Sequence, residues 1–79
     1  MIVDSQYMDF VEIKTSGKTK RYTIFSRSSS AQLGEIKWWG AWRQYCFFPA
    51  EDTVFNCGCM EDIQSAIKLL MLERVREDK

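Results

Sequence analysis

Residues 33–49, with the sequence LGEIKWWGAWRQYCFFP, decide the fold of this chain. They contain all three tryptophans, the only proline and two of the five phenylalanines. Apolar and aromatic residues dominate on both sides of Gly40, which is typical of two β-strands joined by a hairpin turn. We therefore predict strands at 34–39 and 42–48, with a tight two-residue turn between them. Pro49 is expected to end the second strand, because proline donates no hydrogen bond to a neighbouring strand.

Both faces of this predicted hairpin carry large rings. In the first strand Trp38 and Trp39 point to opposite faces, because successive side chains of a strand alternate. In the second strand Tyr45 alternates with Cys46 and Phe48 in the same way. The alternation therefore does not indicate which face is buried.

Two further strands are predicted before the hairpin, at 7–13 and 20–26, where aromatic and branched residues gather. A turn that contains a glycine joins them at 15–18. In the connection that follows the hairpin, Val54 and Phe55 are expected to pack into the core.

A C-terminal helix is predicted at about 59–77, because apolar residues recur there at spacings of three and four. This apolar stripe consists of Met60, Ile63, Ala66, Ile67, Leu70 and Met71. Glu61 and Asp62 are expected in the first turn, where the helix dipole favours negative charge. The predicted fold class is therefore α+β, a small antiparallel sheet of about four strands covered on one face by the helix, in a single domain at 1–79.

Length and charge narrow the function classes. A chain of 79 residues is enough for one domain. Lys and Arg total 11, as do Asp and Glu, so the formal net charge is zero, which disfavours strong non-specific binding to nucleic acid. The apolar runs are far shorter than the roughly eighteen residues of a membrane-spanning helix, and the first residues lack the pattern of a signal peptide. We therefore expect a cytoplasmic protein without a membrane partner.

The three cysteines, Cys46, Cys57 and Cys59, do not fit a common metal site. Zinc sites usually need four ligands at wider spacing, and the chain has no histidine. The odd number of cysteines also disfavours a disulfide framework and fits a reducing compartment. We expect these residues to pack as small apolar side chains, and we predict no metal and no cofactor.

Catalysis is disfavoured by the residue types that are present. Histidine, the commonest general base, is missing, and no serine or cysteine has an evident base partner. The adjacent acids Glu51 and Asp52 fit a solvated loop, as does the serine-rich segment 26–30 around Arg27. We therefore predict that the protein is not an enzyme.

The remaining candidate is an aromatic and basic partner-binding site formed by Lys37, Trp39, Trp42, Arg43 and Tyr45. One helix is too small to cover every large ring of this sheet, so some of these rings are expected at the surface. Trp, Tyr and Arg are enriched in protein-binding hot spots, while aromatic residues on a sheet also stack single-stranded nucleic acid. The zero net charge favours a protein partner over nucleic acid. A homodimer is a further alternative, formed through this face or through a second apolar line on the helix at Leu69, Leu72 and Val75.

The segments LGEIKWWGAWRQYCFFP and TVFNCGCMEDI resemble those of short proteins encoded by bacteriophages and prophages. The resemblance covers about residues 21–70, and WRQYCFFP is its most specific part. It implies a small accessory protein that works in the cytoplasm of an infected bacterial cell by binding a host protein, for example to inhibit an antiviral defence. It transfers no catalytic residue to this chain.

Overall fold

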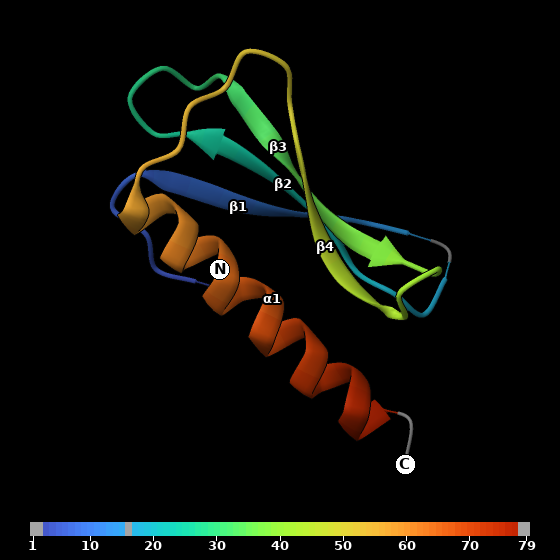
Figure 1. Cartoon of the computed structure of the whole chain (residues 1–79). Coiled ribbons are helices and arrows are strands. Elements are labelled where there is room, and N and C mark those ends of the chain that lie inside the picture. The colour runs from blue at the N-terminus through green and yellow to red at the C-terminus, as the bar shows by residue number, and fades with distance from the viewer. Residues whose placement is uncertain (1–2, 16, 78–79) are drawn as a thin grey trace.

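The computed structural model describes residues 3–15 and 17–77. Within them the elements are β1 (Met8–Ile13), β2 (Arg21–Ser26), β3 (Gln32–Trp39), β4 (Gln44–Pro49) and α1 (Cys57–Glu77). The four strands form one antiparallel sheet in the order β1-β2-β3-β4, and α1 lies against it (Figure 1). The predicted α+β fold class is confirmed. The ends of the predicted domain and Ser16 of the predicted turn at 15–18 lie outside the described residues.

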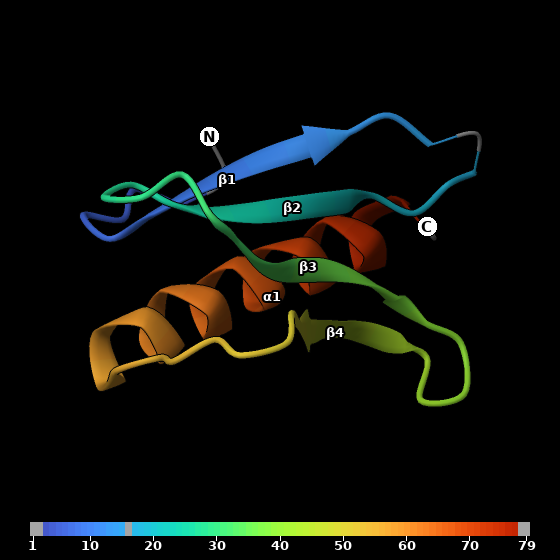
Figure 2. The same cartoon turned by 90° about the horizontal axis from the view of Figure 1, so that it is seen from above.

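The core lies between α1 and one face of the sheet (Figure 2). Strand pairing places the aromatic rings of the core beside aliphatic side chains. Phe10 lies opposite Ile24, and Tyr22 lies opposite Ile36. The helix adds side chains at spacings of three and four. The buried apolar residues are Met8, Phe10, Tyr22, Ile24, Ile36, Tyr45, Cys59, Ile63, Ala66 and Leu70.

A close backbone contact at Gly34 fixes the packing of β3 against β4. A Cβ atom at this position would lie 2.6 Å from the carbonyl oxygen of Phe48 and 2.7 Å from Cε1 of Phe47. No side-chain carbon tolerates such distances, so the sequence needs glycine here for the Phe47 ring to lie across the strand.

The hairpin between β3 and β4 differs from the prediction. Its turn has four residues, at 40–43, because Trp39 pairs with Gln44. The N–H group of Trp42 donates to the carbonyl of Trp39, and that of Arg43 donates to Gly40, each at 3.2 Å. Arg43 adopts a φ of 53°, which closes the turn in the left-handed region. The predicted two-residue turn and the strand start at residue 42 were therefore wrong, whereas the strand does end at Pro49.

The helix starts at Cys57, two residues before the predicted start at 59. The side-chain oxygen of Asn56 accepts a hydrogen bond from the N–H of Cys59 at 2.8 Å, which makes Asn56 the N-cap. The expectation that Glu61 and Asp62 occupy the first turn was wrong, since no acidic residue lies there.

Two predicted core positions were also wrong. Cys59 takes the first core position of the helix, and Met60 is 53% exposed. Val54 is 90% exposed, while Phe55 packs edge-on against Phe47 with 5.2 Å between ring centroids.

Candidate binding surface

The sheet has an open face, the one opposite α1, which none of the described segments covers (Figure 2). Strand alternation sends every second side chain to this face. The register sets Val11, Thr23, Glu35 and Phe48 in one row and Lys37 beside Cys46 in another. The open face is therefore a candidate binding surface that all four strands contribute to.

An aromatic patch occupies the β3–β4 side of the open face, and we define it as Trp39, Trp42, Phe48 and Lys37. The ring of Trp39 packs edge-on against Phe48 and Trp42, with centroids 5.8 and 6.5 Å apart. The Lys37 ammonium lies 4.5 Å from the centre of the Phe48 ring. These contacts hold the rings in place although Trp39 is 43% and Trp42 is 67% exposed.

A shallow hollow of about 270 Å³ lies within the aromatic patch. Its walls are the rings of the patch together with the side chains of Cys46 and Phe47. A hollow with this apolar and aromatic lining fits an inserted apolar side chain better than a charged group.

The structure brings three of the five predicted site residues together. Lys37, Trp39 and Trp42 lie in the aromatic patch, and Arg43 is exposed in the adjoining turn. Tyr45 is 4% exposed on the opposite face, so it does not belong to this surface.

Tyr45 is held on the core side by two contacts. Its Oη accepts a hydrogen bond from the backbone N–H of Lys20 at 3.0 Å, and its ring packs edge-on against Trp38. Trp38 in turn lies 4.2 Å below the guanidinium carbon of Arg74 from α1. Strand alternation explains this placement, since residues 44, 46 and 48 face the open side. The same alternation identifies Phe48 as a patch residue that composition alone missed.

Ion pairs neutralise much of the charge on and beside the open face. Arg21 lies 2.6 Å from the carboxylate of Glu35, and Arg27 lies 3.0 Å from that of Asp9. Among the described residues, Lys37 and Arg43 form no ion pair. The surface is therefore aromatic with two available cations rather than a continuous basic stripe.

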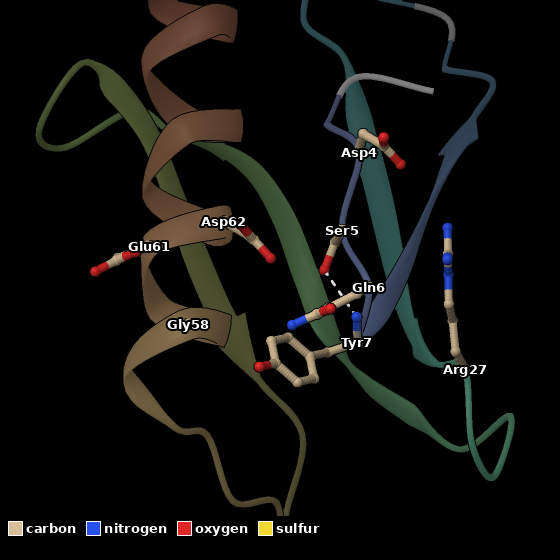
Figure 3. A pocket seen from close by; sticks show the side chains of 8 residues that line it. All are labelled: Asp4, Ser5, Gln6, Tyr7, Arg27, Gly58, Glu61 and Asp62. Carbon is tan, nitrogen blue, oxygen red and sulfur yellow. Dashed lines mark hydrogen bonds between the residues drawn. The ribbon is translucent and has the colours of Figure 1, made fainter.

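A polar cavity of about 460 Å³ lies elsewhere, where the N-terminal segment meets the start of α1 (Figure 3). Ser5 lines it, but its Oγ accepts hydrogen bonds from the N–H groups of Tyr7 and Met8, each at 3.2 Å. Glu61 and Asp62 point to opposite sides of α1 in Figure 3, so the two carboxylates do not converge. Arg27 is paired with Asp9.

The cysteines are dispersed over the fold. Cys46 is half-buried on the open face, Cys57 is exposed at the start of α1, and Cys59 is buried. Within residues 3–15 and 17–77, no three His, Cys, Asp or Glu side chains gather in a way that could hold a metal ion. The described part of the chain also has no helix long and apolar enough to cross a membrane.

The fold and its surface define a small α+β protein with an aromatic patch on the open face of its sheet. The chain belongs to a family of small phage-encoded proteins, as its sequence resemblance implied. It is similar to the "Uncharacterized 9.3 kDa protein" of Acholeplasma phage L2, with 36% identity over 74 residues that cover 92% of this chain and 95% of that protein. No protein-family model matches the chain, and no solved structure matches it.

Proposed function

We propose that this protein is a non-enzymatic phage accessory protein that binds a host protein through the aromatic patch. The observation that carries the proposal is the position of Trp39 and Trp42, which are strongly exposed on a face that no described segment covers. The two rings are in contact, and contiguous exposed apolar patches of this kind often mark sites of protein–protein interaction.

The energetics of the patch fit a protein interface. A fully covered tryptophan side chain buries on the order of 200 Å², and Trp39 is still 43% and Trp42 67% exposed here. At about 25 cal/mol per Å², covering both rings would contribute roughly 5 kcal/mol before the costs of association. Trp39 packs against Phe48, and Trp42 packs against Trp39, so part of the side-chain entropy of the two rings is already lost before binding.

The charge distribution favours a protein over single-stranded nucleic acid. A strand of nucleic acid needs a row of cations along its phosphates. On this face Arg21 is compensated by Glu35, and the net charge of the chain is zero. We therefore propose a partner with an apolar side chain for the hollow and an acidic group near Lys37 and Arg43.

The membership in a phage family supports a partner from the infected cell, because such a partner is present whenever the protein is made. Interference with an antiviral defence is one role that this binding would serve. Capture of a host defence protein would support this role, and capture of another host enzyme would not.

The test is capture of binding partners from host lysate by the tagged protein, with and without nuclease. We expect one host protein to be retained after nuclease treatment. The double variant Trp42→Ala, Arg43→Ala should lose it. The control Val54→Ala changes an apolar residue outside the patch that is 90% exposed, and it should keep the partner. Retention that disappears with nuclease would contradict the proposal and reassign the patch to nucleic acid.

A further inference from the structure

The second surface of interest is the free edge of β4. This strand is last in the sheet, and no other described strand pairs with its outer side (Figure 2). The N–H of Ala50 donates to the carbonyl of Leu33 in the segment of β3 at 2.9 Å. Because backbone groups alternate along an antiparallel strand, residues 44, 46 and 48 also face β3. The backbone groups of Tyr45 and Phe47 therefore face outward.

This edge has only part of the usual protection against pairing with another strand, because Pro49 blocks its end but no charged side chain lies along it. Natural sheets guard their edges with charged side chains, and β1, at the other edge, contains Asp9 and Glu12. In contrast, β4 reads QYCFFP and has no charge. The outward N–H of Tyr45 contacts only the Sδ atom of Met71, at 3.4 Å, and a thioether is a weak acceptor.

An apolar groove of about 710 Å³ runs between this edge and α1. Phe47 forms one wall, and the helix supplies Ile63, Ile67, Met71 and Leu72. The groove adds an apolar floor beside the unpaired backbone groups of β4. A bare strand edge with an apolar floor is suited to the addition of a further strand.

We propose that this strand is β4 of a second copy of the chain, paired antiparallel about a two-fold axis at Cys46. In this register Tyr45 of one copy exchanges two backbone hydrogen bonds with Phe47 of the other. The two-fold axis repeats this Tyr45–Phe47 pair on the other side of Cys46. A register centred on Phe47 would place Tyr45 opposite Pro49, which has no N–H to donate. Proline therefore disfavours the register centred on Phe47, and a register centred on Tyr45 would pair Phe47 with Arg43, which lies outside β4. The register centred on Cys46 is the one that pairs both outward-facing residues of β4.

Charge complementarity favours a second copy as the occupant. The groove has an acidic residue, Glu61, toward the start of α1 and a basic residue, Lys68, about two turns further on. A two-fold axis reverses one groove relative to the other, so the acidic end of each faces the basic end of its partner. The merged grooves would also cover Met60 and Leu72, which are 53% and 58% exposed in one chain.

The first test is the solution mass of the full chain over a range of concentrations. We expect twice the 9.3 kDa chain mass at micromolar concentration. Cys46→Lys places two like charges at the axis and should yield a monomer with an unchanged circular dichroism spectrum. Val11→Lys, at an exposed open-face position of β1, is the matched control and should remain dimeric. A wild-type monomer at all concentrations, even one whose β4 binds an extended peptide of another protein, would overturn the proposal.

The second test uses the geometry of the axis. Opposed residues of a non-hydrogen-bonded antiparallel pair have Cα atoms about 4.5 Å apart, within the range that a disulfide spans. Diamide, an added thiol oxidant, should therefore link two copies of the variant Cys57→Ser, Cys59→Ala through Cys46. The matched variant Cys46→Ser, Cys59→Ala should link at least tenfold more slowly, because the axis holds the two Cys57 residues at opposite ends. Equal rates for the two variants would overturn the proposed register.

Discussion

Trp38 and Trp39 are adjacent in β3 but lie in opposite environments. Trp38 packs against Tyr45 and beneath Arg74, so its ring joins the sheet to the helix. Trp39 contacts Phe48 and Trp42 and remains 43% exposed. The period of two along a strand is enough to place one tryptophan against the helix and to expose the next one on the open face.

At the same scale, Tyr22 makes the free energy of unfolding fall at alkaline pH. Its burial raises the pKa of the phenol above the usual 10.0, and the nearby Glu12 carboxylate raises it further. The folded chain thus favours the neutral phenol. Its contribution is complete below the unfolded-state pKa and is lost as the pH rises through the folded-state pKa.

We therefore expect the free energy of unfolding to fall above about pH 10, and to fall less steeply in Tyr22→Phe, which cannot ionise. A smaller fall should remain in the variant, because the hydrogen bond from Lys20 to Glu73 raises the pKa of Lys20. Urea unfolding between about pH 8 and 11 measures both slopes. Equal slopes for the wild type and the variant would show that Tyr22 does not carry the effect.

At the scale of elements, α1 depends on its N-cap. Asn56 accepts the N–H of Cys59, and this bond places Cys59 and Ile63 on the core side of the helix. Asn56→Ala should lower the free energy of unfolding by about 1 kcal/mol. Asn56→Asp keeps an acceptor oxygen and should stay within a few tenths of a kcal/mol of the wild type. Urea denaturation compares the three proteins, and an alanine variant as stable as the wild type would rule out this cap.

The sequence patterns predicted four strands followed by a helix along the chain, but neither the pairing of the strands nor every boundary. Apolar periodicity indicates a helix wherever the stripe repeats, yet its first residue depends on a cap such as Asn56, which belongs to the preceding segment. The length of the β3–β4 turn depends on the left-handed conformation of Arg43, which is rare for this residue type. Helix existence was therefore predictable, and the exact turn was not.

Strand alternation alone predicts which residues of the candidate site share a face of the sheet. Lys37 and Trp39 share a face by alternation alone, and so do Cys46 and Phe48. Tyr45 was grouped with them by composition, although its position already sends it to the other face. What no pattern reveals is which face α1 covers, because both faces carry rings and the choice depends on tertiary packing.

At the scale of the whole molecule, the sheet has two separate surfaces, and we propose a different task for each. The proposed task of the open face is to bind a host protein through the aromatic patch, and that of the β4 edge is to pair with a second copy. Pairing through β4 would continue one sheet across the axis, so both aromatic patches would lie on the same side of the dimer. Such a dimer would bind a repeated or symmetric target with increased avidity.

The most direct measurement of the central claim is the affinity of the captured host protein for the wild type and for Trp42→Ala. Trp42 is 67% exposed, so the variant should unfold within about 0.5 kcal/mol of the wild type. Its dissociation constant should rise at least tenfold, while that of Val54→Ala should not change. An unchanged affinity of a fully folded Trp42→Ala protein would contradict the aromatic patch as the binding surface.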